Sequence, residues 1–368
     1  MSTSLPKRTA SLLRHVAARK RAEALVGFDG FVDTILHVVK TRTSATDYER
    51  CESMTEWAGR IAAASGVSAN FEFVPQRVKL GGNGPIMANA LLELGLGVRY
   101  IGTLGKPALH PVFADFGKRA RVFSLAEPAQ TDAIEFTDGK LMCSKLENLR
   151  EANWGNLVRH IPEAKLVRLF AESDLIAMVN WTMLSELTGI FRNLLAHILP
   201  ELTGSRRWIF FDLADPAKRS RADLRDVLRL IGRCEKHARV IFGMNLGEAR
   251  QVSEVLGLGG VEETGADVAR AASRIRDQLG IDTAVIHPMR FAAAADADGT
   301  AHVNGPLTLK PKITTGAGDN FNAGFCLGRI RDLGLAESLQ TGVAASGYYV
   351  RSGKSPNIPA LIRFLRSL

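Results

Sequence analysis

Short apolar runs alternate with longer segments of helical periodicity along most of the chain. Strand-sized apolar runs lie at 98–102, 174–180, 207–212, 239–244 and 282–287. Between and beside them, apolar residues recur three and four positions apart, which predicts helices at 84–95, 184–199, 218–236 and 264–279. Strands separated by helices favour right-handed crossovers. The pattern therefore predicts an α/β fold in which helices cover both faces of a mostly parallel sheet.

Two regions depart from this alternation and predict a second, smaller sheet. A first strand at 25–28 ends in a glycine-containing turn and leads into another extended segment. Further along, 121–146 contains three short β-like runs with a turn at Asp138-Gly139. We expect the segments near 31–40 and 121–146 to pair as a small β-sheet appended to the main domain.

The beginning of the chain predicts further helices. Residues 9–21 combine apolar and basic positions at helical spacing, so we predict a basic helical extension at 1–23, followed by one domain at 24–368. Thr46-Asp47 is the N-cap that we predict for a helix at 47–64. No internal repeat or low-complexity linker divides the rest of the chain.

The net charge of +9 is concentrated at the two ends of the sequence. Residues 1–21 hold six Lys and Arg residues and 351–368 hold four, with no acidic residue in either segment. The remaining residues, 22–350, carry 37 basic and 38 acidic side chains and therefore a net charge of −1. A nearly neutral body does not attract polyanions, so we expect neither nucleic acid nor a membrane as partner.

Several other classes of protein are excluded by composition and motifs. The longest apolar runs fall far short of the roughly 18 residues of a membrane span, and the four cysteines contain no CxxC pair. We therefore expect a cytoplasmic protein with free thiols and neither disulfides nor a zinc site. The absence of a GxxxxGK[ST] loop, and of a GxGxxG loop with its acidic partner, disfavours P-loop NTPases and Rossmann dehydrogenases.

The strongest motif is Thr314-Thr315-Gly316-Ala317-Gly318-Asp319, followed by apolar residues at helical spacing. Two glycines around a small residue allow a tight turn and close backbone approach to a ligand. The free N–H groups at the helix N-terminus bind anions, and Asp319 could take a proton from an attacking hydroxyl beside a bound phosphate. A lone GxGD would be only a helix cap, but the longer GAGDxFxAG context favours the catalytic interpretation.

Asn245 and Glu248 follow the predicted strand 239–244 and lie three residues apart on the first turn of a helix. They are thus predicted at the carboxyl end of a parallel strand, where ligands of α/β proteins bind. Glu248 is suited to hold a hydrated Mg²⁺, and Asn245 to reach phosphate or water. An ordinary helix start is an equally good interpretation of NxxE alone.

A second glycine loop and two early carboxylates complete the candidate site. Gly81-Gly82-Asn83 precedes the predicted helix 84–95, and Asp29 and Asp33 follow the first strand. Such carboxylates could bind sugar hydroxyls, although solvated turn residues are the alternative. Asp212 and Asp215-Pro216, after the strand 207–212, are assigned to loop structure because nothing nearby suggests a second base.

Together these motifs resemble the PfkB carbohydrate kinases of the ribokinase-like superfamily, from about residue 24 to about residue 356. The resemblance implies a three-layer α/β core with a β-sheet lid and ATP- and Mg²⁺-dependent phosphorylation of a hydroxymethyl group. It implies that Asp319 is the general base and that Gly316–Gly318 form the anion hole. By the same resemblance, Asp33 and Gly82-Asn83 contact the substrate, and Asn245 and Glu248 lie on the Mg²⁺–phosphate side.

Other positions depart from the family pattern around the donor. His287-Pro288-Met289 replaces the Thr-x-Gly that borders the nucleotide, and Gly342 replaces an Asn near the adenine. Ile313 stands where the family has an Asp associated with a monovalent cation, and Ile86 replaces an Asn of the glycine-loop helix. We expect His287, Thr315 and Gly342 to contact the nucleotide.

The stretch 84–89 is similar to ADP-dependent sugar kinases of the same superfamily, so ADP as donor stays open beside ATP. The substrate is expected to be a small sugar or a nucleoside, and two chains could pair as a homodimer through their lids. A nucleoside kinase, a non-catalytic regulator on this fold and a nucleic-acid-binding protein are the alternatives. Arg351 and Lys354 could attract phosphates near the nucleotide.

Overall fold

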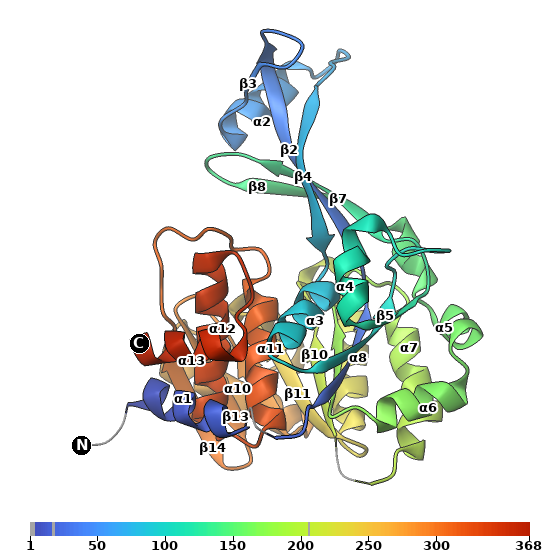
Figure 1. Cartoon of the computed structure of the whole chain (residues 1–368), viewed down its shortest axis with the longest axis vertical. Helices are drawn as coiled ribbons and strands as arrows, with labels where there is room; N and C mark the ends of the chain where they lie inside the picture. Colours follow the sequence, from blue (N-terminus) through green and yellow to red (C-terminus); the bar gives the residue numbers. More distant parts are fainter. Residues whose placement is uncertain (1–3, 17–18, 205–206) are drawn as a thin grey trace.

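The computed structural model describes residues 4–16, 19–204 and 207–368. Within them the chain forms a nine-stranded sheet, in the order β14-β13-β12-β11-β10-β9-β1-β5-β6, and a smaller five-stranded sheet that projects from it (Figure 1). The strands of the large sheet are β1 (Glu23–Phe28), β5 (Gly97–Gly102), β6 (Arg121–Ser124), β9 (Leu175–Val179), β10 (Trp208–Asp212), β11 (Arg239–Met244), β12 (Thr283–Ile286), β13 (Phe291–Asp296) and β14 (Gly299–Asn304).

Seven neighbouring strands of the large sheet, from β12 to β6, run parallel, whereas β13 and β14 are antiparallel at one edge. Every residue of β9, β10 and β12 is buried. Strands covered on both faces need apolar residues at successive positions, which explains the uninterrupted apolar runs of the sequence. The α/β fold class predicted from those runs is confirmed by this sheet.

Helices cover both faces of the large sheet and bury a separate hydrophobic cluster on each. One layer consists of α1 (Leu5–Val16), α3 (Asn83–Glu93), α11 (Ala317–Ile330), α12 (Leu335–Ser352) and α13 (Ile358–Ser367). The other consists of α5 (Trp154–His160), α6 (Glu163–Ala171), α7 (Leu187–Asn193), α8 (Arg221–Cys234), α9 (Leu246–Leu256) and α10 (Gly265–Leu279). Shorter helical segments are α4 (Ala114–Arg119), η1 (Pro111–Phe113), η2 (Glu147–Glu151), η3 (Leu194–Ile198), η4 (Leu199–Glu201) and η5 (Pro216–Lys218).

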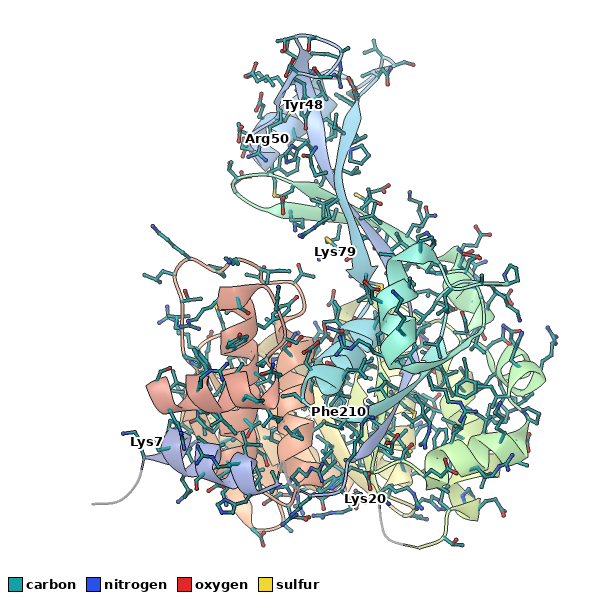
Figure 2. All side chains as sticks on the ribbon, in the orientation of Figure 1. Lys7, Lys20, Tyr48, Arg50, Lys79 and Phe210 are labelled. Atoms are coloured by element: carbon teal, nitrogen blue, oxygen red, sulfur yellow. The ribbon has the colours of Figure 1, made fainter. Side chains whose placement is uncertain are left out.

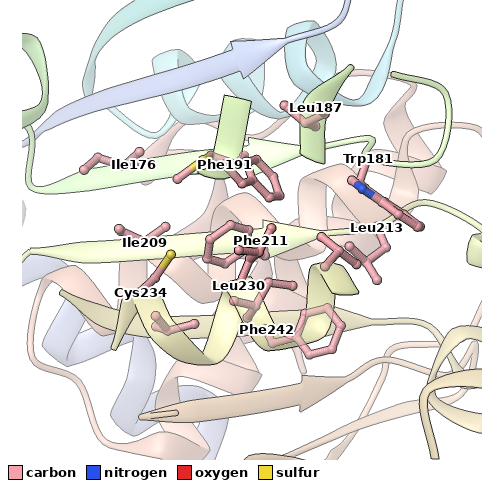
Figure 3. Close-up of a cluster of buried hydrophobic side chains, with 14 of the residues drawn as sticks. Ile176, Trp181, Leu187, Phe191, Ile209, Phe211, Leu213, Leu230, Cys234 and Phe242 are labelled. Atoms are coloured by element: carbon pink, nitrogen blue, oxygen red, sulfur yellow. The ribbon is translucent and has the colours of Figure 1, made fainter. Parts of the chain in front are cut away.

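Strand β10 shows how the two clusters are separated. Ile209 and Phe211 pack into the cluster beneath α7 and α8, beside Phe191 and Leu230 (Figure 3). Phe210, which points to the opposite face, belongs to the cluster under α11 and α12. Because successive side chains of a strand point to opposite faces, one short apolar run supplies both layers of the core.

The smaller sheet, here called the lid, consists of β2 (Phe31–Arg42), β3 (Tyr48–Arg50), β4 (Phe73–Gly81), β7 (Ala129–Glu135) and β8 (Lys140–Lys145), together with helix α2 (Met54–Ala63). Two predictions about this region are wrong. Residues 121–124 form β6, which pairs with β5 in the large sheet and so lies outside the lid. The helix predicted at 47–64 begins only at Met54, because Tyr48–Arg50 form β3 and Ser53, not Thr46-Asp47, accepts the N-cap hydrogen bond from Glu56 N–H.

The lid has a small hydrophobic cluster of its own on one face. Trp57 of α2 packs there with Ile134 of β7 and with Phe136, which directly follows that strand. The residue between these two, Glu135, points to the other face and pairs with Lys140, the two charged groups lying 2.9 Å apart. One face of the lid is therefore apolar and covered by α2, and the other is charged.

The basic N-terminal segment is joined to the large domain rather than separate from it. Helix α1 packs against α12 and α13, and its residues Ala10, Leu13 and Val16 are buried in the cluster of that layer. The predicted helix thus begins earlier than residue 9, and residues 17–18 of the prediction lie outside the described residues. In the described part of the chain, no helix combines the length and the apolar character that crossing a membrane requires.

Candidate active site

Polar side chains from four neighbouring strands gather at one edge of the large sheet. Asp29 follows β1, Asn180 follows β9, Asp212 ends β10 and Asn245 follows β11. The carboxyl ends of parallel strands meet at this edge, which is the usual ligand-binding edge of such sheets. The N-termini of α3, α9 and α11 come to the same edge, so free backbone N–H groups accompany the carboxylates.

The GAGD motif forms the N-terminus of α11, as the sequence predicts. Gly316 is the N-cap and has a φ of 91°, a left-handed conformation that favours glycine. A Cβ at Gly316 would also lie 2.9 Å from the hydroxyl of Tyr349, which donates a hydrogen bond of 3.0 Å to the carbonyl of Thr315. Gly316 is therefore required both by the turn and by the close approach of α12.

Asp319 lies on the first turn of α11 and is only 6% exposed. Its Oδ1 accepts a hydrogen bond of 3.1 Å from the Nδ2 of Asn83, so the two glycine loops meet at this carboxylate. Burial first, and the negative charge of Asp212 second, raise the pKa of Asp319 well above its usual value. A carboxylate with a raised pKa is a stronger proton acceptor, as a general base requires.

Asp29 was expected to contact the substrate, but the structure places it out of reach. The residue is fully buried. Its two carboxylate oxygens accept hydrogen bonds from Asn83 N–H, Gly84 N–H and the Nδ2 of Asn180, at 2.9, 2.9 and 2.6 Å. A carboxylate surrounded by donors of the protein has no face left for a sugar hydroxyl.

Asp33 lies on β2 of the lid, where the lid meets the core. Its carboxylate rests against Gly81, at which a Cβ would lie 2.3 Å from the Asp33 Oδ1. The Nζ of Lys79, which faces the space between lid and core in Figure 2, is 3.9 Å from its Oδ2. Burial raises the pKa of Asp33, opposed by the positive charges of Lys79 and Lys140.

A cavity of about 420 Å³ extends from the N-terminus of α11 along α12. Its polar end contains Asn245, His287, Thr314 and Gly318. Its other end is mostly apolar and is lined by Met289, Phe291, Pro306, Leu307, Val343 and Val350, with Thr308 and Ser346 as its polar residues. A polar end beside free helix N–H groups and an apolar slot beyond it suit the phosphates and the base of a nucleotide.

Two of the expected nucleotide contacts do not line this cavity. Thr314 rather than Thr315 forms the wall, and the carbonyl of Thr315 is occupied by Tyr349. Gly342 is buried against Phe321, where a Cβ would approach its ring to 2.8 Å, so this glycine serves the packing of α12 on α11. Both residues instead take part in the contact between α11 and α12, Thr315 through Tyr349 and Gly342 through Phe321.

His287 is the expected contact that does line the cavity. Its ring packs on Phe321, with centroids 4.7 Å apart, and its buried Nε2 has no hydrogen-bond partner among the described residues. Burial lowers the pKa of His287 to about 4. The imidazole is therefore neutral at pH 7 and leaves one ring nitrogen free to bind a ligand at the polar end of the cavity.

Asn245 and Glu248 form a complete capping box at the start of α9. The Asn245 Oδ1 accepts from Glu248 N–H at 3.0 Å, and the Glu248 Oε2 accepts from Asn245 N–H at 2.8 Å. The other oxygen of Glu248 accepts from Asp215 N–H at 2.9 Å. The structural interpretation of NxxE is thus correct for these contacts, while Asn245 also lines the cavity.

Three buried carboxylates near this edge, Asp212, Glu248 and Asp319, have no cationic side chain among their hydrogen-bond partners or ion pairs in the described residues. Burial raises the pKa of Glu248 to about 8 and that of Asp212 to about 6. Such a donor set fits a hard divalent cation such as Mg²⁺. Within the described residues no three His, Cys, Asp or Glu side chains are close enough to hold a metal directly, so a cation here would share its ligands with phosphates and water.

The sequence also missed or misjudged several residues of this region. Asp212, assigned to loop structure, accepts a buried hydrogen bond of 2.7 Å from the Nδ2 of Asn322 on α11. Arg351 was expected to attract phosphates, but its guanidinium donates to the carbonyls of Pro306, Leu307 and Gly347 at 2.7–2.8 Å. The contacts of Asp212 and Arg351 are made with residues about 45 to 110 positions away in the sequence or with backbone carbonyls. Such contacts leave no motif in the sequence.

Comparisons with known proteins agree with this geometry. Residues 10–367 match the model of the prokaryotic ketohexokinase family. A ketohexokinase of Haloferax volcanii is 32% identical over 342 residues, which cover 92% of this chain and 90% of that protein. These matches favour a sugar kinase over a non-catalytic regulator and over a nucleic-acid-binding protein.

Solved structures share the fold at much lower identity. A ribokinase of Arabidopsis thaliana complexed with ribose and ATP is 14% identical, with a TM-score of 0.65 over 95% of this chain and 99% of that one. Phosphofructokinase-2 of Escherichia coli is 15% identical, with a TM-score of 0.64 over 95% of this chain and 99% of that one.

The fold is thus that of the ribokinase-like kinases, and the protein is a carbohydrate kinase, a phosphotransferase with an alcohol group as acceptor. The family match covers the core, the lid and both glycine loops. The chain belongs to the prokaryotic ketohexokinase family.

Proposed function

We propose that this kinase transfers the γ-phosphoryl group of ATP to a hydroxymethyl group of a ketohexose. The observation that carries the proposal is the hydrogen bond between Asn83 and Asp319, which joins the sugar-side glycine loop to the base at the anion-binding helix. A ketose bound at the Gly82-Asn83 loop and Asp33 has its hydroxyl beside Asp319. The family match and the Haloferax volcanii relative supply the choice of a ketohexose.

In the proposed reaction, Asp319 accepts the proton of the attacking hydroxyl as that oxygen approaches the γ-phosphorus in line. The backbone N–H groups of residues 316–319 then stabilise the negative charge on the transferring phosphoryl group. Asp33, on the lid, holds substrate hydroxyls and brings the lid over the site, which excludes water from the donor. The transferred phosphoryl replaces the hydroxyl proton, and the nucleoside diphosphate leaves.

Magnesium bound to the donor phosphates would supply further neutralisation of their charge. On the protein side, Glu248 would hold the hydrated cation from the start of α9, with Asp212 in the same carboxylate set and Asn245 on the phosphate side. His287 would donate to or accept from the donor at the polar end of the cavity. The apolar end, between Met289 and Val343, would hold the base.

The donor and the acceptor can be identified in one experiment. The purified protein is given fructose, other ketoses, ribose and nucleosides, each with ATP or ADP and Mg²⁺, and phosphorylated product is measured by mass spectrometry. We expect product with ketohexoses and ATP. Product only with ADP would transfer the proposal to an ADP-dependent kinase, and product only with nucleosides would replace the sugar by a nucleoside.

A homodimer through the lids is a further part of the proposal that can be tested. Light scattering after size-exclusion chromatography gives the mass directly, and disruption by a charge at the exposed Val78 of β4 would locate the interface. A monomeric mass at the concentration of the activity assay would exclude a dimer as the active form.

A further inference from the structure

Two connections between the core and the lid lie side by side at the active-site edge. Asp29 and Gly30 connect core strand β1 to lid strand β2, and Gly82 connects Gly81, the end of lid strand β4, to core helix α3 (Figure 1). Strands β2 and β4 pair along most of their length, with Phe31 opposite Gly81. Movement of the lid relative to the core therefore involves these two short connections, together with those that precede β7 and follow β8.

The carboxylate of Asp29 links the two connections directly. It belongs to the first of them and accepts from the N–H groups of Asn83 and Gly84, just after the second, both at 2.9 Å. The fit is close, since a Cβ at Gly84 would lie 2.5 Å from the Asp29 Oδ1 and one at Gly82 would lie 2.9 Å from its Oδ2. Glycines at these positions allow the N-terminus of α3 to sit on the carboxylate.

Two more donors fix the carboxylate itself. The Nδ2 of Asn180, at the end of β9, donates to the Asp29 Oδ2 at 2.6 Å. The hydroxyl of Tyr100, on β5, donates to the Asp29 backbone carbonyl at 2.6 Å and lies 3.3 Å from its Oδ1. Strands β9 and β5 flank β1 in the sheet, so the carboxylate is held from both neighbouring strands of the core.

Asn83 continues this set of contacts to the base. Its backbone N–H is bonded to Asp29, and its side chain donates to the Asp319 Oδ1. Only one residue thus separates the buried carboxylate from the group that accepts the substrate proton. A shift of the α3 N-terminus would move the amide that orients Asp319.

We propose that Asp29 is a positioning residue that ties the β1–β2 and β4–α3 connections together and, through Asn83, orients Asp319 for proton transfer. It touches no substrate, because it is fully buried and its oxygens are occupied by protein donors. The inference rests on the proposed kinase function only for its effect on turnover. The effect on the α3 N-terminus is independent of any activity.

Asp29→Asn is the decisive variant. The amide keeps the shape of the side chain, but its NH₂ group cannot accept a hydrogen bond. In either orientation of the amide, its NH₂ group faces a donor of the protein, from Asn83 and Asn180 at one oxygen position or from Gly84 at the other. The α3 N-terminus should therefore move away from residue 29.

Asp296→Asn is the matched control. Asp296 is also a buried carboxylate, paired with Arg329 at 3.0 Å, but it ends β13 at the opposite edge of the sheet. Both variants remove one buried charge and should lower the free energy of unfolding. Only Asp29→Asn should lower kcat, by about 10- to 100-fold, which is the effect of a misplaced reacting group.

The measurements are kcat and KM for both substrates, the ratio of donor hydrolysis to sugar phosphorylation, and hydrogen exchange of the amides of residues 83 and 84. For Asp29→Asn we expect a lower kcat, a higher hydrolysis ratio and faster exchange at these two amides. Equal kcat values for Asp29→Asn and Asp296→Asn, both folded at the assay temperature, would overturn the proposal. So would unchanged exchange at residues 83 and 84.

Two provisions keep the test decisive. If Asp29→Asn does not fold, Tyr100→Phe removes one donor to the same residue and should change the same three quantities in the same direction, or the proposal fails. If the wild-type protein phosphorylates no sugar, the proposed function fails, while exchange at residues 83 and 84 still decides the structural link.

Discussion

The two sides of the active site differ in how completely the protein satisfies their polar groups. On the acceptor side, Asp29 has four donors around it, and Asn83 contacts Asp319 before any substrate is bound. On the donor side, His287 Nε2 and Asn322 Oδ1 are buried without partners among the described residues, and Asp212 and Glu248 have no cation beside them. On the acceptor side, the Oδ1 of Asn180 is the corresponding buried atom without a partner among the described residues. The acceptor side is mostly prearranged, whereas the donor side combines unpartnered buried atoms with buried carboxylates that lack a counter-charge.

This difference has a physical consequence for stability. Buried hydrogen-bonded groups stabilise a fold or cost little, whereas buried groups without partners cost free energy until a ligand supplies the missing contact. Nucleotide with Mg²⁺ should therefore raise the melting temperature more than the sugar does at equal saturation. The following changes test that contrast, in order of decreasing expected effect.

Asp319→Asn should have the largest effect, because it removes the proposed base, which lies between the two sides. We expect kcat to fall about 100- to 10,000-fold, the usual contribution of a general base. The fold should survive, since the Asn carbonyl can still accept from Asn83 and a buried negative charge is lost. Steady-state kinetics and thermal unfolding measure both. Phosphotransfer at a near-wild-type rate would show that another group accepts the proton.

Glu248→Gln should weaken the donor side alone. We expect the Mg²⁺-dependent rate to fall about 10- to 100-fold, as for groups that orient a metal site, while KM for the sugar stays nearly constant. A titration of activity against Mg²⁺ concentration measures the effect. An equal change in the KM values of sugar and nucleotide would contradict the separation of the two sides.

The same variant should also change the pH dependence of stability. Burial raises the pKa of Glu248 from 4.5 to about 8, so the folded state binds its proton more tightly than the unfolded state. The contribution of this group to the free energy of unfolding therefore falls as pH rises from 4.5 to about 8. Glu248→Gln lacks this loss, and denaturant unfolding between pH 5 and pH 8 should show a smaller decline for the variant than for the wild type.

Arg351→Met should enlarge the donor slot without touching the chemistry. Met replaces the apolar stem of the Arg side chain but leaves the carbonyls of Pro306, Leu307 and Gly347 without their donor. We expect KM for the nucleotide to rise about tenfold, equivalent to about 1.4 kcal/mol, with little change in kcat. The exposed Lys354 is the control, and Lys354→Met should leave KM unchanged. Equal effects of the two variants would mean that only net charge matters.

His287→Phe should have the smallest effect. The ring contact with Phe321 is preserved while the free ring nitrogen is lost, so KM for the nucleotide should rise about threefold, as for one neutral hydrogen bond. The wild-type His287 has its pKa lowered to about 4. The unfolded state therefore binds a proton that the folded state does not, and wild-type stability falls relative to the variant as pH drops from 6.5 to 4. If the free energy of unfolding changed with pH in the same way for the wild type and the variant, burial of the His287 ring would be contradicted.

The sequence predicted those features that depend on neighbouring residues. The parallel strands follow from uninterrupted apolar runs, and the N-terminus of α11 follows from the consecutive residues Gly316–Asp319. The fold class and the kinase activity expected from the family resemblance are confirmed. The individual roles of Asp33, Asn83 and Asp319 remain predictions, which the variants above test.

Features that depend on distant partners were not predictable. Asp29 and Asp33 are both acidic residues after the first strand, yet only the positions of Asn180 and Tyr100 make the first one structural. Strand β4 was missed because its residues are mostly polar or partly exposed, and β6 was assigned to the lid because a short β segment carries no mark of its sheet. Which strands pair with each other is decided by the tertiary structure and not by the sequence of each strand alone.

The lid's separate hydrophobic cluster has an evolutionary consequence. Trp57, Ile134 and Phe136 are held together by residues of the lid alone, so substitutions on its charged face need not disturb the core on which phosphoryl transfer depends. A kinase built in this way can change its acceptor sugar through substitutions in the lid and keep the core residues that bind the phosphoryl donor. Exchange of residues 31–80 and 129–145 between relatives is therefore a natural route to new specificities.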